Sequence, residues 1–229
     1  MIKTVALFDI DGTLLHTRGA GHLGACRALA SAFGAEPTSG EITFAGRTDR
    51  GIVSDLFRLH DIEESAENWH LFQTHYLQHL KETVAETAGV VLPGVELLLR
   101  VLDEPGYSEI AVGLLTGNTQ QAAKVKLAYF GLDQFFLFGG FGDDWACRND
   151  AARAAFENSK TFAGGELKAE QIVVIGDTPN DIVCAKAIEA RVIAVSTGSY
   201  SEDELTEAEP DHLLADLTDT DAVLSILCG

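Results

Sequence analysis

Short apolar runs alternate with longer amphipathic segments along most of the chain. The first run, Val5–Phe8, predicts a buried strand. Further strands are expected at Glu109–Leu115, Phe135–Phe138, Gln171–Ile175, Val192–Val195 and His212–Leu214. Helical spacing predicts helices at Val95–Leu102, Gln120–Phe130, from Asn149 or Asp150 to Lys160, from Asp181 to Ala190, and from Asp221 onward. Strands that alternate with helices in this way predict a parallel sheet covered on both faces.

The segment that follows the first strand has a different pattern, with no convincing strand. Helices are predicted at Ala20–Phe33, Arg50–His60 and Ser65–Ala88, and a loop at Pro37–Thr48. The expected fold is therefore a doubly wound, Rossmann-like α/β core with an inserted all-helical cap. We expect residues 1–16 and 90–229 to form the core and residues 17–89 to form the cap.

Composition narrows the class of protein. Apolar residues make up 46% of the 229 positions and charged residues 22%, which is ordinary for a globular protein. No apolar run is long enough to cross a membrane, and the N-terminus passes directly into the first strand without a signal peptide. We therefore expect a cytoplasmic location and no membrane partner. The four cysteines form no Cys-x-x-Cys pair, so we expect reduced thiols.

The net charge of −19 affects which ligands are expected. A field of this sign repels the phosphate backbone, so nucleic-acid binding is disfavoured. It would also repel a small anionic substrate. A phosphate site must therefore gain local positive charge from a metal ion, from backbone N–H groups and from a few basic side chains.

Polar residues follow three of the predicted strands. Asp9 and Asp11 follow the first strand, where two nearby carboxylates are costly unless a cation or a proton holds them. A simple Asp-Gly turn is the alternative for this segment alone. The second strand is followed by Thr116, Gly117 and Asn118, and the fourth by Asp177 and Asp181. The carboxyl ends of parallel strands share one edge, so four carboxylates should converge there, which favours Mg²⁺.

These segments together resemble the motifs of the haloacid dehalogenase superfamily. Asp9-x-Asp11-Gly12-Thr13 resembles the first motif, Thr116-Gly117-Asn118 the second, and Gly176-Asp177-x-x-x-Asp181 the fourth. With a helical insert after the first strand, the chain is similar to the phosphoglycolate phosphatase-like and β-phosphoglucomutase-like branch. The resemblance covers nearly the whole chain, and it is specific because the motifs occur in order, each at a strand end.

The resemblance implies a Mg²⁺-dependent phosphatase that acts on a small phosphate monoester. Asp9 would be the nucleophile that forms an aspartyl-phosphate. Asp11 would act as general acid and then as base, while its backbone carbonyl contacts the metal. Asp177 would bind Mg²⁺, and Asp181 would bind the metal or a ligand of the metal.

The loops after the strands would bind the phosphate. The resemblance assigns this role to Gly12, Thr13, Thr116, Gly117 and Asn118. The family's third motif is a lysine, usually followed by proline, but no Lys-Pro occurs between Thr116 and Asp177. We expect Arg148 to take this position rather than Lys160, because sites favour loops at strand ends.

Several smaller signals remain open. Arg47 lies between predicted cap helices and would either contact the substrate or be a solvated loop residue. His16, Thr17 and Arg18 lie on the linker into the cap, where a closing lid would bring them to the substrate. His75 and His79 have the i, i+4 spacing of a metal pair, although a solvated helix face is the simpler interpretation.

Other functions on the same fold are less favoured. A phosphomutase would use the same nucleophile with a bisphosphate intermediate. A dehalogenase is disfavoured, because dehalogenases of the superfamily lack the acid/base aspartate that Asp11 provides here. A catalytically silent binding module is disfavoured by the intact aspartates. The sequence fixes neither the substrate nor the oligomeric state.

Overall fold

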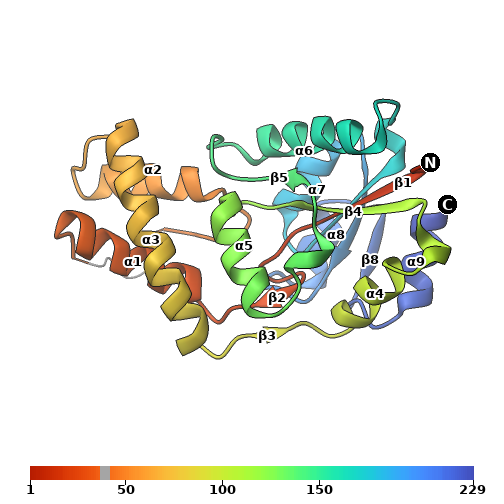
Figure 1. Cartoon of the computed structure of the whole chain (residues 1–229), viewed down its shortest axis with the longest axis horizontal. Helices are drawn as coiled ribbons and strands as arrows, with labels where there is room; N and C mark the ends of the chain where they lie inside the picture. The colour runs from red at the N-terminus through yellow and green to blue at the C-terminus, as the bar shows by residue number, and fades with distance from the viewer. Residues whose placement is uncertain (37–41) are drawn as a thin grey trace.

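The protein consists of an α/β core and a helical cap (Figure 1). The computed structural model describes residues 1–36 and 42–229, so positions 37–41 of the predicted loop Pro37–Thr48 lie outside the described residues. The core contains a parallel sheet with the strand order β5-β4-β1-β6-β7-β8. Its strands are β1 (Thr4–Phe8), β4 (Ile110–Leu115), β5 (Gly139–Gly140), β6 (Ile172–Gly176), β7 (Arg191–Val195) and β8 (His212–Leu214). This confirms the predicted doubly wound sheet.

Helices cover both faces of the sheet. Successive side chains of β1 point to opposite faces and so belong to two different apolar layers. Val5 and Leu7 face the layer formed with α6 (Arg148–Ala163), α7 (Pro179–Lys186) and α8 (Glu202–Glu207). Ala6 and Phe8 face the layer formed with α4 (Val95–Leu102), α5 (Gln120–Tyr129) and α9 (Thr220–Cys228). Because both faces are covered, every residue of β1 is buried, which explains its uninterrupted apolar run.

The cap lies beyond one end of the sheet (Figure 1). Its helices are α1 (Ala20–Phe33), α2 (Asp49–Leu59) and α3 (Ala66–Glu86), which share a separate apolar cluster around Phe57, Phe72 and Leu80. Two short strands that the sequence did not predict, β2 (Leu15–His16) and β3 (Val90–Val91), pair antiparallel where the chain leaves and re-enters the core. This ribbon lies next to the predicted boundaries between core and cap, which stay a prediction.

The predicted strand Phe135–Phe138 is wrong. A 3₁₀ turn covers Asp133–Phe135, and the strand that pairs with β4 is Gly139–Gly140, in a segment predicted to be a loop. The phenylalanines of this run are partly buried instead: Phe135 and Phe136 pack against the apolar layer with α4, α5 and α9, and Phe138 packs against the opposite layer. A Cβ on Gly140 would lie 2.2 Å from the carbonyl oxygen of Ala151, so the close approach of α6 requires glycine in this strand.

Other predicted boundaries also shift. Helix α6 starts at Arg148, before the predicted Asn149 or Asp150, and α7 ends at Lys186, short of Ala190. The acidic run after Ser201 forms α8, because the Ser201 hydroxyl accepts the backbone N–H of Glu204 at 3.3 Å. Two further 3₁₀ turns occur at Pro105–Tyr107 and Ala169–Gln171.

The four cysteines are unpaired. No helix in the described part of the chain combines the length and apolar character needed to cross a membrane.

Candidate active site

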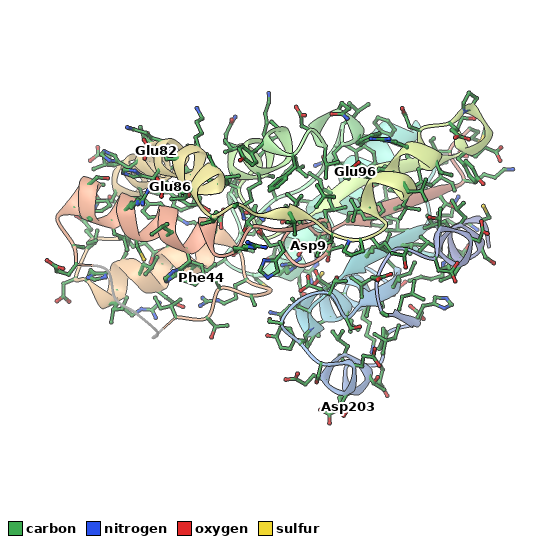
Figure 2. The ribbon with its side chains drawn as sticks, turned by 90° about the horizontal axis from the view of Figure 1, so that it is seen from below. Asp9, Phe44, Glu82, Glu86, Glu96 and Asp203 are labelled. Carbon is green, nitrogen blue, oxygen red and sulfur yellow. The ribbon has the colours of Figure 1, made fainter. Side chains whose placement is uncertain are left out.

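A cavity of about 300 Å³ lies between the core and the cap, at the carboxyl ends of β1, β4 and β6. Figure 2 shows Asp9 in the interior, between the cap helices and the strands of the core. Most of the predicted site residues line this cavity, namely Asp9, Asp11, Gly12, Arg47, Thr116, Gly117, Asn118, Arg148 and Asp177. The remaining two, Thr13 and Asp181, lie behind it and contact the lining residues. The structure therefore brings the sequence-predicted site together.

One part of the cavity, which we call the Arg148 side, consists of Asp9, Asp177, Asp181 and Arg148. All four side chains are buried. The three aspartates each offer a carboxylate oxygen within 4.8 Å of the others. The Nη2 atom of Arg148 lies 3.0 Å from Asp9 Oδ1 and also donates to Asp181 Oδ1. A single guanidinium thus contacts two of the three buried carboxylates.

Asp181 holds Arg148 in place. Its Oδ1 accepts from Arg148, and its Oδ2 accepts the backbone N–H of Thr178 at 2.9 Å and the hydroxyl of Thr178 at 2.8 Å. Thr178 is also the N-cap of α7, where an oxygen acceptor is favoured. Both oxygens of Asp181 are therefore engaged with protein donors, and one of these donors is Arg148.

The Arg148 side carries more negative charge than its protein partners offset. Burial raises the pKa of Asp9 to about 6, against the opposing effect of Arg148. Burial, with Asp181 and Asp9 nearby, raises the pKa of Asp177 to about 9. Asp177 Oδ1 accepts the hydroxyl of Thr13 at 3.1 Å, but its Oδ2 accepts from no donor among the described residues. This set of hard oxygen donors, with uncompensated charge, fits a divalent cation such as Mg²⁺.

Another part of the cavity, which we call the Lys126 side, consists of Asp11, Asn118, Lys126 and Asp49. Lys126 projects from α5 and is only 4% exposed. Its Nζ donates to Asp11 Oδ2 at 2.5 Å and to Asn118 Oδ1 at 2.6 Å. The sequence prediction missed this lysine. Its signal is positional, because Lys126 shares the buried face of α5 with Ala122, Ala123 and Leu127.

Asp11 is held by three donors. Besides Lys126, its Oδ2 accepts the Asn118 side-chain amide at 2.9 Å, and its Oδ1 accepts the Thr17 hydroxyl at 3.1 Å. Although desolvation acts in the opposite direction, Lys126, Asn118 and Thr17 together lower the pKa of Asp11. Asp11 and Asp9 thus differ in charge environment although they are two residues apart.

Asp49, the first residue of α2, joins the cap to the core and was also missed. Its Oδ2 accepts the backbone N–H of Thr119 at 2.8 Å, and its own N–H donates to the carbonyl of Gly117 at 2.7 Å. Desolvation at this contact raises the pKa of Asp49 to about 6. A Cβ on Gly117 would lie 1.9 Å from the carbonyl oxygen of Arg47, so this approach of the cap requires glycine.

The family model described as haloacid dehalogenase-like hydrolase matches residues 6–195 of the chain. The chain belongs to this family. It is 31% identical to a phosphoglycolate phosphatase of Cereibacter sphaeroides, over 84% of each chain. It is 24% identical to the pyrophosphatase PpaX of Halalkalibacterium halodurans, over 95% of this chain and 94% of that one. The structure of CbbY from Rhodobacter sphaeroides in complex with phosphate superimposes with a TM-score of 0.71 at 19% identity, over 96% of each chain. The predicted family, its phosphoglycolate phosphatase-like and β-phosphoglucomutase-like branch and the enzyme class are confirmed.

Arg148, which we expect to take the basic position of the family's third motif, lies within the site of this haloacid dehalogenase-like hydrolase. Lys160, the alternative, lies near the other end of α6, where its Nζ binds Glu157 at 2.7 Å and lies 4.1 Å from the ring centre of Phe156. Arg148 is instead the first residue of α6 and contacts Asp9 directly. Its guanidinium fork suits this bridging role between two carboxylates.

The smaller candidates divide between the cavity and the cap. Arg47 lines the cavity, but its guanidinium donates to Asp55 Oδ2 at 2.6 Å and to the Gly51 carbonyl at 3.1 Å, so its charge is engaged within the cap. His16 and Arg18 line the cavity at the linker, where the His16 ring accepts the backbone N–H of Arg18 at 3.2 Å. The pair His75 and His79 lies apart from the cavity, with both rings on the hydroxyl of Ser31 at 2.8 and 3.0 Å.

Proposed function

We propose that this hydrolase is a Mg²⁺-dependent phosphatase that cleaves a small phosphate monoester through an aspartyl-phosphate on Asp9. The observation that carries the proposal is the position of Asp9. Its buried carboxylate lies beside Asp177 and Arg148, in a cavity that also holds the charged pair of Asp11 and Lys126. A nucleophile, a cation site and a proton-transfer group are thus adjacent, as phosphoryl transfer requires.

Asp9 and Asp177 would hold Mg²⁺, with the backbone carbonyl of Asp11 as a further ligand and Asp181 orienting Arg148. The bound ion would supply a positive charge that stabilises the charge on the phosphoryl oxygens. Arg148, the first residue of α6, would add a second positive charge. The hydroxyl of Thr116 and the loops that contain Gly12, Thr13, Gly117 and Asn118 would contact the phosphoryl oxygens.

The reaction would proceed in two steps. Asp9 attacks phosphorus and the bond to the ester oxygen breaks. Asp11 reacts in its protonated form and gives its proton to that oxygen, which leaves as an alcohol. A water molecule then attacks the aspartyl-phosphate, loses a proton to Asp11 and releases inorganic phosphate. Asp9 and Asp11 are both restored at the end of this cycle.

The substrate would be a small organic phosphate such as phosphoglycolate. Two observations support a small substrate: the relatives include a phosphoglycolate phosphatase, and the cavity holds about 300 Å³ beneath the cap. The strongly negative chain, at −19, makes the local cations essential for binding any such anion.

A panel of esters tests this function. Phosphate release is measured for phosphoglycolate, glycerol phosphate, glucose phosphate and p-nitrophenyl phosphate, with Mg²⁺ and again with EDTA. We expect release that depends on Mg²⁺ for at least one alkyl ester. Isomerisation of glucose phosphate without phosphate release would identify a mutase instead. No release from any ester would favour a silent binding module.

Replacing the nucleophile gives the sharpest test of the mechanism. Asp9→Asn should lower kcat on the order of 10⁴-fold or more, because the amide cannot form the acyl-phosphate bond. Mass spectrometry should detect a phosphorylated Asp9 peptide after rapid acid quench of the unmodified enzyme only. Asp133→Asn, at an exposed position of the core, serves as the matched control and should retain full activity. Hydrolysis that persists in Asp9→Asn would exclude the aspartyl-phosphate route.

A further inference from the structure

Lys126 is an unusual lysine, because it is almost fully buried and comes from the core rather than from the cap. Only 4% of its surface is exposed, and buried lysines in proteins are almost always paired. Its Nζ contacts Asp11 Oδ2 at 2.5 Å and Asn118 Oδ1 at 2.6 Å. Lys126 also lines the cavity, so its ammonium lies between the apolar core and the substrate space.

The bonds around Lys126 form a closed network. The side-chain amide of Asn118 donates to Asp11 Oδ2 at 2.9 Å, while its oxygen accepts from Lys126. Lys126 and Asn118 therefore donate to the same carboxylate oxygen and are also hydrogen-bonded to each other. The other oxygen, Asp11 Oδ1, has the hydroxyl of Thr17 at 3.1 Å as its partner among the described side chains. Oδ1, with one such donor against two for Oδ2, is thus the less engaged oxygen of Asp11.

We propose that Lys126 is a positioning residue for proton transfer at Asp11, an inference that rests on the proposed phosphatase function. Lys126 fixes Oδ2 and thereby directs Oδ1 toward the ester oxygen of the substrate. In the first step the proton on Oδ1 passes to that oxygen, which keeps the electron pair of the broken P–O bond. In the second step Oδ1 accepts a proton from the attacking water. Lys126 itself neither gains nor loses a proton.

This role predicts that the effect of Lys126 depends on the leaving group. An alkoxide needs a proton as it leaves, whereas p-nitrophenolate is stable enough to leave without one. The quantity to compare is kcat/KM, because it reports the steps up to loss of the leaving group and excludes hydrolysis of the aspartyl-phosphate. Lys126→Met keeps a side chain of similar length and removes the ammonium.

For Lys126→Met we expect kcat/KM on the best alkyl ester to fall on the order of 10²-fold, the usual size of a general-acid contribution. The value on p-nitrophenyl phosphate should stay close to that of the unmodified enzyme. Lys126→Arg, which retains the positive charge, should recover part of the lost alkyl-ester activity. Lys124→Met removes an exposed lysine from the same helix and should leave kcat/KM unchanged on both substrates.

A double variant distinguishes positioning from an independent contribution. If Lys126 acts through Asp11, Asp11→Asn with Lys126→Met should lose no more alkyl-ester activity than Asp11→Asn alone. Thermal unfolding of each variant checks that the fold persists. Should Lys126→Met fail to fold, Lys126→Gln, which is shorter than lysine and removes the ammonium, should show the same leaving-group pattern.

The outcomes separate the two proposals. Equal losses on alkyl and p-nitrophenyl esters, or no loss on either, would overturn the role of Lys126 while leaving the phosphatase function intact. Additive losses in the double variant would also overturn it. An unmodified enzyme that releases phosphate from no ester would overturn the proposed function and the role of Lys126 together.

Discussion

The Arg148 side and the Lys126 side of the cavity both place a basic residue of a core helix among carboxylates, yet their charge balance differs. Arg148 contacts two of three clustered, buried aspartates, and the pKa values of Asp9 and Asp177 are raised to about 6 and about 9. Lys126 forms an ion pair with one carboxylate, and the pKa of Asp11 is lowered. The Arg148 side has three carboxylates for one protein cation, so it is the side that requires a further cation.

The two sides also rest on different elements. The Arg148 side is built entirely from the core, from residues that follow β1 and β6 and from the first turn of α6. The Lys126 side includes Asp49 of α2, and Asp11 contacts Thr17 of the linker. A movement of the cap would therefore change the Lys126 side and leave the Arg148 side intact. In the proposed mechanism, residues of the core alone would bind the phosphate, while the groups near the leaving oxygen would depend on the position of the cap.

The largest expected effect breaks the Arg148 side. Arg148→Met should lower the free energy of unfolding by about 3–5 kcal/mol, because it leaves two buried carboxylates, Asp9 and Asp181, without their cation. Urea denaturation without Mg²⁺ measures this loss. Lys160→Met, at the exposed ion pair with Glu157 on the same helix, should cost less than about 1 kcal/mol. Equal losses in the two variants would contradict the central role of Arg148.

The Arg148 side was predictable from the sequence because each of its residues follows a strand or begins a helix. An apolar run that ends in Asp9, and another that ends in Asp177, place both carboxylates at one edge of the sheet whatever the details of packing. Strand β5 was not predictable, since its two residues, Gly139 and Gly140, carry no apolar pattern. Their pairing follows from the close approach of α6, which is a tertiary property.

The next expected effect is stabilisation of the folded protein by Mg²⁺, which should depend on the Arg148 side and not on the Lys126 side. Mg²⁺ at about 100 times its Kd should raise the free energy of unfolding by about 2.7 kcal/mol, because it binds the folded state preferentially. Asp177→Asn should lose most of this gain, since it removes a carboxylate of the Arg148 side. Lys126→Met should keep it. Chemical denaturation with Mg²⁺ or with EDTA provides the measurement, and an unmodified protein that Mg²⁺ does not stabilise would exclude a metal at these aspartates.

The Lys126 side was less predictable for a physical reason. Lys126 and Asp49 lie within helices, where the sequence indicates burial only through periodicity, and both are charged residues that normally face solvent. Their roles arise from contacts between elements far apart in the chain, such as the bond from Thr119 N–H to Asp49. A lysine among Ala122, Ala123 and Leu127 on one helix face is the pattern that could have drawn attention to it.

The smallest expected effect concerns the contact between cap and core at Asp49. The folded state raises the pKa of this carboxyl from 3.8 to about 6, so it retains a proton that the unfolded chain releases in this range. Stability should therefore fall as the pH rises from about 4 to about 7. Asp49→Asn keeps an oxygen that can accept the Thr119 N–H but does not titrate.

The measurement for Asp49 is the difference in unfolding free energy between the unmodified protein and Asp49→Asn across this pH range. Because the side chain keeps some contact with the cavity, we expect the unmodified protein to lose about 1–2 kcal/mol relative to the variant as the pH rises. Asp133→Asn should follow the unmodified protein, since Asp133 is exposed. Parallel curves for all three proteins would show that Asp49 is charged in the folded state at every pH, and that the Lys126 side offsets its charge as fully as that of Asp11.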